Sequence, residues 1–156
     1  MGVVVEKYGF EAFVGMTNTA MKSIQRMKVQ KMKKYDLSSA HTNCICRLET
    51  AGKEGLTQTE LVRQEMMDPS QISRVLRELS VKGYVQLSGE EGKYRRRYSL
   101  TVEGEKIAAE IRGIVEEIHR FVIRDIPRED IEAFYRTFES ICSGLSCAEE
   151  SYLNQE

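Results

Sequence analysis

The sequence predicts a mainly α protein with one small β-hairpin, an α+β arrangement, and three observations support this fold class. Apolar residues recur at helical spacing through long stretches at both ends of the 156-residue chain. A short central stretch carries both the start and the stop signals of a helix. Two strand-like segments follow it at once and are separated by a glycine-containing loop. We expect these elements to form a single domain over residues 1–156, because this length suits one domain.

The first helix is expected over residues 8–34, where aliphatic, aromatic and methionine side chains share one face and no proline interrupts them. With its flanks, residues 6–35, it forms the first long terminal helix. A second, shorter helix is expected over residues 40–50, after a polar cap, and it closes at Gly52.

Two further helices follow in close succession. The third is expected over residues 57–66, because Thr57 and Glu60 fit a capping box, in which each side chain bonds the backbone N–H of the other residue. The fourth is expected over residues 69–83, with Asp68 as its cap, a proline at its first position and a glycine at its end. Two short helices joined by a tight turn form a helix-turn-helix, although this turn lacks the usual glycine.

The helix over residues 69–83 has one apolar and one polar face. The apolar face follows the i, i+3, i+4, i+7 rule and is expected to enter a core. Its members are Ile72, Val75, Leu76 and Leu79. The opposite face consists of Ser70, Gln71, Ser73, Arg74 and Arg77. These side chains donate hydrogen bonds to base edges and phosphates, and they crowd the N-terminal turns, which meet bases in a major groove. A solvated polar face is the alternative.

A basic hairpin is expected next, formed by residues 84–88 and 94–100. In its second strand, Tyr98 and Leu100 are expected to face inward and the alternate arginines outward. A helix-turn-helix followed at once by such a hairpin is a winged helix. The winged-helix part is expected over about residues 37–101.

Four motifs resemble the MarR family of bacterial transcription regulators. They are GLTQTEL at 55–61, SQISRVLREL at 70–79, KGYV at 82–85 and YSLTVEG at 98–104. The resemblance covers most of the chain and implies a homodimeric regulator of the repressor type. The family's usual wing carries an Asp-x-Arg motif, whereas the matching positions here are Gly92, Lys93 and Tyr94. The wing tip therefore departs from the family pattern.

We expect the homodimer to bind double-stranded DNA at an inverted-repeat operator, with half-sites about 10 base pairs apart or a multiple of that. The recognition helix would enter a major groove, and the wing would lie along the backbone or in the adjacent minor groove. The expected DNA contacts are Thr57, Gln58, Ser70, Gln71, Ser73, Arg74, Arg77, Lys93, Arg95, Arg96 and Arg97. A winged-helix module that binds protein and never DNA is the alternative.

Two long helices are expected after the hairpin. Residues 101–125 predict a helix of roughly 36 Å, and Pro127 starts another that ends near Gly144. Their one-sided apolar stripes extend beyond a winged-helix core and need a partner, so we expect a homodimer; an intramolecular three-helix bundle is the alternative. The tail, residues 147–156, is expected to fray. The expected dimerisation helices span residues 6–35 and 101–145.

The MarR resemblance also implies a small-molecule effector, bound between the dimer helices and the winged module, that weakens DNA binding by respacing the recognition helices. The candidate effector-binding residues are Met16, Met21, His41, Cys44 and Ile111. A thiol-redox switch is the alternative, because some MarR-like proteins respond to cysteine oxidation. The cysteines available are Cys44, Cys46, Cys142 and Cys147, and no sequence feature indicates a thiol with a lowered pKa.

Composition and motifs argue against other classes of protein. The hydrophobic fraction of 41% and charged fraction of 30% are usual for a globular protein. No apolar run approaches the ~20 residues that span a membrane, and no signal peptide is evident, so we expect a cytoplasmic protein. The net charge of −1 does not indicate a nucleic-acid binder, but the charge is unevenly spread. No motif suggests an enzyme, a cofactor or a metal site, since His41 and Cys44 alone cannot hold a metal.

Overall fold

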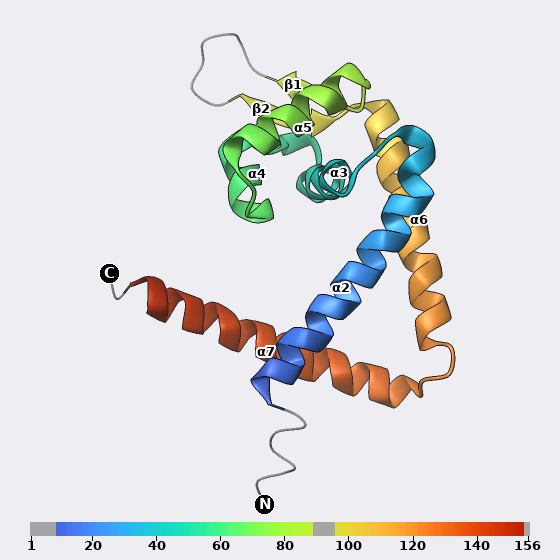
Figure 1. Cartoon of the computed structure of the whole chain (residues 1–156), viewed down its shortest axis with the longest axis vertical. Helices are drawn as coiled ribbons and strands as arrows, with labels where there is room; N and C mark the ends of the chain where they lie inside the picture. The colour runs from blue at the N-terminus through green and yellow to red at the C-terminus, as the bar shows by residue number, and fades with distance from the viewer. Residues whose placement is uncertain (1–8, 89–95, 155–156) are drawn as a thin grey trace, which may run out of the picture. The chain divides into compact units, whose positions relative to one another are not determined.

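The computed structural model describes residues 9–88 and 96–154. Contacts divide the chain into two compact units, Met1–Glu117 and Ile118–Glu156. The predicted fold class, mainly α with one β-hairpin, is confirmed. The single domain over residues 1–156 stays a prediction. The elements in chain order (Figure 1) are α2 (Phe10–Met32), η1 (Lys33–Tyr35), α3 (Ser39–Ala51), η2 (Gly52–Glu54), α4 (Gln58–Glu65), α5 (Pro69–Val81), β1 (Val85–Ser88), β2 (Arg97–Leu100), α6 (Val102–Ile123) and α7 (Arg128–Leu153).

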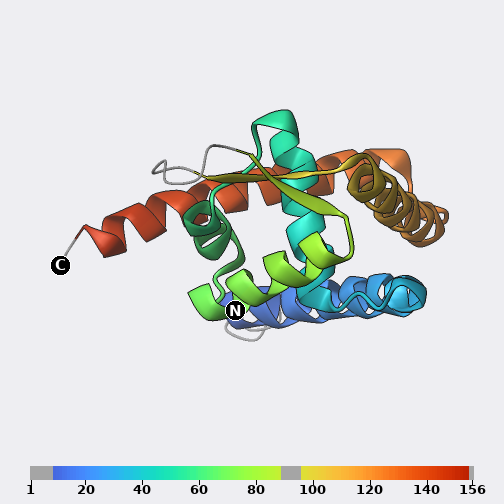
Figure 2. The same ribbon diagram turned by 90° about the horizontal axis from the view of Figure 1, so that it is seen from above.

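Helix α3 is central to the core of the first unit. It contacts α2, α4, α5 and β2, and Figure 2 shows the hairpin crossing over it. The predicted apolar face of α5 is buried in this core: Ile72, Val75, Leu76 and Leu79 are each at most 3% exposed. Because this stripe is turned inward, the polar stripe of α5 is turned out.

The hairpin is joined to the helix-turn-helix by an additional backbone bridge. Strands β1 and β2 pair antiparallel, with Val85 opposite Leu100. Beyond them, the N–H of Leu56 donates to the carbonyl of Tyr98 at 2.9 Å, and the N–H of Tyr98 donates back at 2.7 Å. The sequence did not predict this bridge, which fixes the hairpin against the segment before α4. The predicted hairpin loop, residues 89–93, lies outside the described residues.

The caps predicted around the helix-turn-helix are confirmed. Thr57 Oγ1 accepts the N–H of Glu60 at 3.2 Å, and the Glu60 carboxylate accepts the N–H of Thr57 at 2.8 Å. The Asp68 carboxylate accepts the N–H two residues on at 2.7 Å, and Gly83 is left-handed with φ 77°. In the turn between α4 and α5, Met66 adopts the left-handed conformation (φ 51°) where a glycine is usual.

Tyr35 ties the end of α2 to α6. Its hydroxyl donates to Glu110 Oε2 at 2.6 Å, and Lys34 Nζ lies 2.5 Å from Glu110 Oε1. The hydrogen bond from Lys34 and then that from Tyr35 hold the pKa of Glu110 below its ordinary value.

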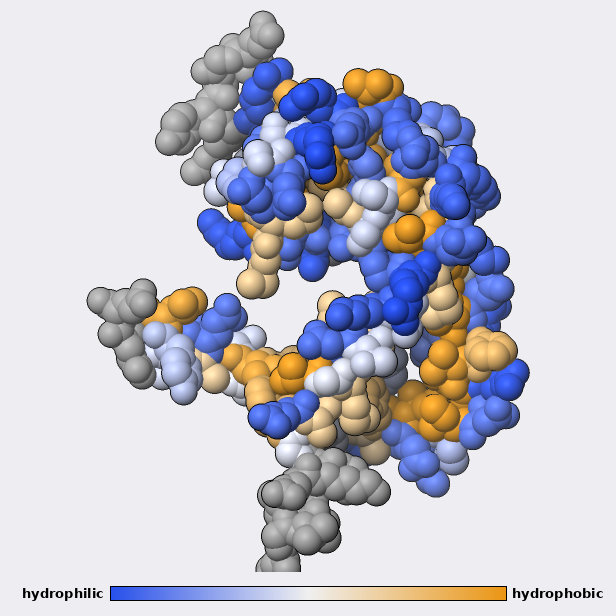
Figure 3. Space-filling view, viewed as in Figure 1, coloured by the Kyte–Doolittle hydropathy of each residue, from blue (hydrophilic) through white to orange (hydrophobic). Residues whose placement is uncertain are grey.

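Helix α7 starts after Pro127 as predicted but is longer than expected. The predicted end near Gly144 is wrong, because α7 continues to Leu153. The predicted fraying of the tail stays a prediction. A glycine inside a helix costs only about 1 kcal/mol relative to alanine, and no proline follows Gly144 to stop the helix. No described side chain of α7 is buried, and Figure 3 shows apolar side chains at the surface. Although α2, α6 and α7 are long, none of the described helices is apolar enough to cross a membrane.

Candidate nucleic-acid interface

The outward face of α5 presents a set of free hydrogen-bond donors. Gln71, Arg74 and Arg77 are exposed, and Ser73 is half-buried. The side chain of Arg74 is 68% exposed and makes only a loose contact with Glu78, at 3.9 Å between Nε and Oε1. No carboxylate among the described residues pairs with Arg77. The face can therefore donate to an external acceptor.

The first turn of α5 is engaged with its own cap. The Asp68 carboxylate accepts hydrogen bonds from both the N–H and the hydroxyl of Ser70. The hydroxyl bond is the larger cause that lowers the pKa of Asp68. An ionised carboxylate thus stands at the start of the helix, where it could accept a hydrogen bond from a cytosine amino group and would repel a phosphate.

Thr57 and Gln58 hold the helix-turn-helix together. Thr57 is occupied by the capping box of α4. The Gln58 side chain donates to the backbone carbonyl of Pro69 at 3.3 Å. Both residues therefore position α4 against the start of α5, in addition to any contact they make with DNA.

The side chain of Arg97 turns back onto the protein. Its Nε donates to the carbonyl of Glu54 at 2.8 Å, and its Nη2 donates to the carbonyl of Gly55 at 3.0 Å and to Glu60 Oε2 at 3.2 Å. The side chain is 34% exposed. Arg97 therefore braces β2 against the start of α4.

The other predicted wing contacts divide into two groups. Arg96 is exposed, next to the braced Arg97. Lys93 and Arg95 lie outside the described residues. Of the wing arginines that the structure describes, Arg96 is the one whose side chain faces solvent.

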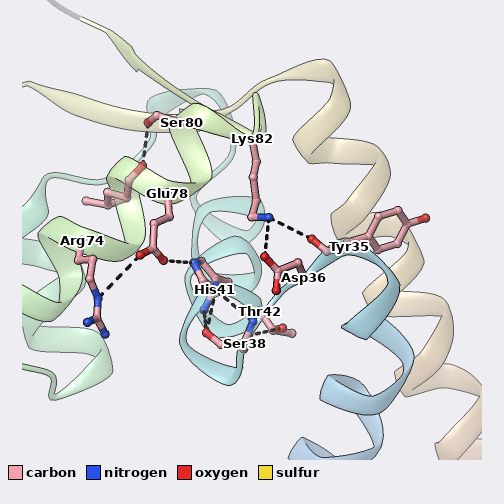
Figure 4. Close-up of polar contacts among 10 residues, drawn as sticks. Tyr35, Asp36, Ser38, His41, Thr42, Arg74, Glu78, Ser80 and Lys82 are labelled. Atoms are coloured by element: carbon pink, nitrogen blue, oxygen red, sulfur yellow. Dashed lines mark hydrogen bonds and ion pairs between the residues drawn. The ribbon is translucent and has the colours of Figure 1, made fainter.

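Polar contacts link the back of α5 and the residue after it to α3 and to the segment before α3 (Figure 4). Glu78 Oε2 lies 2.7 Å from His41 Nε2. Lys82 Nζ donates to the carbonyl of Tyr35 at 3.3 Å and to the carboxylate of Asp36 at 3.4 Å. The last turns of α5 are thereby held at two points.

A hollow of about 410 Å³ lies beside these contacts. Its lining residues are Val29, Lys33, Asp36, Leu37, Ser38, His41, Glu78 and Lys82. Among the predicted effector-binding residues, His41 lines this hollow. Cys44 and Ile111 are instead buried in the core, and Met16 and Met21 are exposed on α2. The structure therefore does not bring those five side chains together.

Sequence reasoning missed the charged residues of the hollow. Glu78 and Lys82 stand four positions apart on one helix face, which was the available local signal. Their partners His41 and Asp36 are 37 and 46 positions away in the sequence. No helical or strand periodicity predicts contacts at that separation.

Burial disfavours a reactive thiolate at two of the four cysteines, Cys44 and Cys46. Cys44 is fully buried, and burial raises its pKa to about 12, with a contribution from the nearby Glu65 carboxylate. Burial also raises the pKa of Cys46, while Cys142 and Cys147 are exposed on α7. A thiol that stays protonated at neutral pH reacts slowly with oxidants. Within residues 9–88 and 96–154, no three metal-binding side chains lie close enough to hold a metal ion.

A helix-turn-helix followed by a hairpin that is bridged and braced to it defines a winged helix. Solved structures of MarR and MepR have this fold. Apo MarR from E. coli matches with a TM-score of 0.69 and 18% identity over 85% of this chain and 96% of that chain. A Staphylococcus aureus MepR–DNA complex matches with a TM-score of 0.69 and 17% identity over 85% of this chain and 97% of that chain.

A third similar structure is MepR described as a transcription regulator of the S. aureus multidrug efflux pump MepA, with a TM-score of 0.66 and 18% identity over 83% of this chain and 96% of that chain. No protein-family model and no curated protein matches the chain. The predicted resemblance to MarR proteins is thus confirmed at the level of the fold.

Proposed function

We propose that the chain is a DNA-binding transcription regulator. The observation that carries this proposal is the outward face of α5, where Gln71, Arg74 and Arg77 are exposed at positions that a recognition helix uses in a major groove. A structure with the same fold, that of MepR, is a complex with DNA. A module that binds only protein would not need this row of exposed donors, two of which are cationic. A regulator of this kind would act in the cytoplasm.

The regulator would act as a homodimer on an inverted repeat. Helices α2, α6 and α7 expose large apolar side chains, and those of Phe10, Met16, Phe121, Phe134 and Tyr135 are 54–73% exposed. Amphipathic helices are stabilised mainly by burying such a face, and a second copy offers a matching face under two-fold symmetry. The two recognition helices would then meet half-sites about 10 base pairs apart, or a multiple of that.

The test is a titration of the purified protein with the DNA upstream of its own gene, at several salt concentrations and against nonspecific duplex. We expect specific, saturable binding at one dimer per site. Arg74→Ala and Arg77→Ala should each lower affinity, and each should reduce the salt slope by about 1 if it contacts a phosphate. Arg128→Ala, an equal change of charge on α7, is the matched control and should leave affinity unchanged. Equal affinity for specific and nonspecific DNA would overturn the proposal.

We infer further that a small-molecule effector binds in the hollow. Val29 and Leu37 supply apolar surface, and Lys33 supplies a cation at the same opening, where Lys82 is paired with Asp36. This combination suits a small aromatic carboxylate, because its ring would contact the apolar side chains and its acid group would pair with the cation. Because Glu78 is on α5 and Lys82 directly follows that helix, occupation of the hollow would shift the recognition helix.

Benzoate is a suitable probe of this site. We expect it to weaken binding to the operator, and by linkage the operator should weaken benzoate binding by the same factor. Lys33→Ala should abolish the effect, because it removes a cation from the hollow without touching α5. Lys106→Ala, on the exposed start of α6, should not. An operator affinity that benzoate leaves unchanged would overturn the effector site but not the regulator.

A further inference from the structure

Glu78 stands between the outward face of α5 and the hollow. One carboxylate oxygen, Oε2, lies 2.7 Å from His41 Nε2 on α3. The other, Oε1, lies 3.9 Å from Arg74 Nε one turn earlier on the same helix. Figure 4 shows the carboxylate between these two partners. A single side chain thus connects a residue that lines the hollow to a residue of the proposed DNA-binding face.

His41 is fixed in place by its own helix. Its Nδ1 accepts the backbone N–H of Ser38 at 3.0 Å, and Ser38 Oγ accepts the backbone N–H of His41, which completes a capping box at the start of α3. Because Nδ1 is an acceptor here, the ring proton of the neutral imidazole lies on Nε2 and is donated to Glu78. The His41 side chain is only 10% exposed, so this donor has a fixed direction.

The bond to His41 draws the Glu78 carboxylate away from Arg74. Residues four apart on a helix are neighbours, and a glutamate with no other partner would pair closely with an arginine at that spacing. Instead, the Arg74 contact is at the outer limit of an ion pair. Lys82, four positions beyond Glu78, bonds Tyr35 and Asp36 rather than Glu78. Among the described residues, His41 is therefore the competitor of Arg74 for this carboxylate.

We propose that His41 is a positioning residue for DNA binding: by holding Glu78 against α3, it keeps the guanidinium of Arg74 available to DNA and connects the hollow to the recognition face. The proposal rests on the proposed DNA-binding function. The proposal also predicts whether a ligand in the hollow strengthens or weakens DNA binding. A ligand that accepts the hydrogen bond from His41 Nε2–H in place of Glu78 releases the Glu78 carboxylate, which then pairs with Arg74 and weakens DNA binding.

A double-mutant cycle on the full-length protein tests this. His41→Asn retains an acceptor near the position of Nδ1, so it preserves the capping box, but it has no atom that reaches Glu78. We expect His41→Asn to weaken operator binding about two- to five-fold, the scale of one solvent-exposed ion pair. In a Glu78→Gln background, where the side chain no longer carries a charge, His41→Asn should have no effect. In an Arg74→Ala background it should also have none, because the competing group is absent.

Ser38→Ala is the matched control. It removes the hydroxyl of the same capping box, which also lies 2.7 Å from His41 Nδ1, but it retains the Ser38 backbone N–H that donates to Nδ1. The His41 bond to Glu78 should therefore stay in place, and we expect lower stability to urea with unchanged operator affinity. A loss of affinity in Ser38→Ala equal to that in His41→Asn would overturn the proposal, because a structural role would then explain both.

Two further outcomes separate this proposal from the proposed function. If the wild-type protein binds the operator but His41→Asn weakens binding equally in the presence and in the absence of the Glu78→Gln substitution, only the positioning role is overturned. If the wild-type protein shows no specific binding, the proposed function fails and the positioning role with it. Long-range ¹H–¹⁵N NMR gives a readout without DNA: we expect the His41 ring proton on Nε2, and a neutral ring protonated on Nδ1 would contradict the proposed bond.

Discussion

Replacing Arg97 by alanine would test whether this wing arginine braces the protein or contacts DNA. The substitution removes two hydrogen bonds to backbone carbonyls, those of Glu54 and Gly55, and one ion pair to Glu60. A hydrogen bond that involves a charged group contributes about 1.5–3 kcal/mol when it is buried. Because the Arg97 side chain is 34% exposed, solvent screening reduces that value, and we expect a total loss of about 1–2 kcal/mol in the free energy of unfolding.

The assay combines urea unfolding with operator titration at several salt concentrations. If Arg97 is a brace, Arg97→Ala lowers stability and leaves the salt slope unchanged, since no phosphate contact is lost. Arg96→Ala, the adjacent exposed arginine, is the matched control: it should leave stability unchanged and lower the slope by about 1 if Arg96 meets a phosphate. Unchanged stability of Arg97→Ala together with a slope lower by about 1 would refute the bracing role.

Three other predictions concern stability, measured by urea unfolding. Gly104→Ala should lower stability by about 1–3 kcal/mol, because a Cβ there would collide with the backbone carbonyl of Tyr84. In the same helix, a Cβ at Gly113 would meet no neighbouring atom, so Gly113→Ala should raise stability by about 0.5–1 kcal/mol. Equal effects of the two substitutions would contradict the packing at α6. Met66→Gly should raise stability by about 1 kcal/mol, because Met66 is left-handed and 93% exposed, and a loss of stability would refute strain in that turn. Glu110 has a lowered pKa in the folded state, so its contribution is complete above its ordinary value of 4.5 and is lost as the pH falls below that value. The free energy of unfolding of Glu110→Gln should therefore fall less steeply than that of the wild-type protein between about pH 6 and pH 3. The same pH dependence in both proteins would contradict the contact of Glu110 with Lys34 and Tyr35.

Local chemistry allowed much of the fold to be predicted from the sequence. The capping box of Thr57 and Glu60 and the cap at Asp68 involve residues two or three positions apart, so their hydrogen bonds form wherever those residues start a helix. The capping box at the start of α3 escaped prediction because its partner is His41 rather than the usual glutamate or glutamine. Gly144 was overinterpreted as a stop, since its cost is smaller than the stability that the rest of α7 supplies.

Contacts across the fold could not be predicted in the same way. Alternation along β2 placed Arg97 on the outer side of the hairpin, and its side chain does leave the core. The alternation does not predict that the segment before α4 pairs with Tyr98 through Leu56. That pairing brings the carbonyl of Gly55 within reach of the Arg97 side chain. Periodicity assigns a side chain to a face, whereas the partner it meets there depends on which distant segment packs alongside.

The charges on α5 support the proposal that its outward face meets a polyanion rather than solvent alone. Arg74 and Arg77 lie one turn apart and repel each other, which destabilises a helix slightly. A solvated face usually offsets such a pair with acids three or four positions away, but around Arg77 those positions hold only neutral side chains and Arg74. The one acid near Arg74, Glu78, is drawn towards α3 by His41. Within the described part of the chain, Arg77 pairs with no carboxylate and Arg74 has only a loose contact with Glu78. This supports the proposed external partner, because the phosphates of DNA favour closely spaced positive charges.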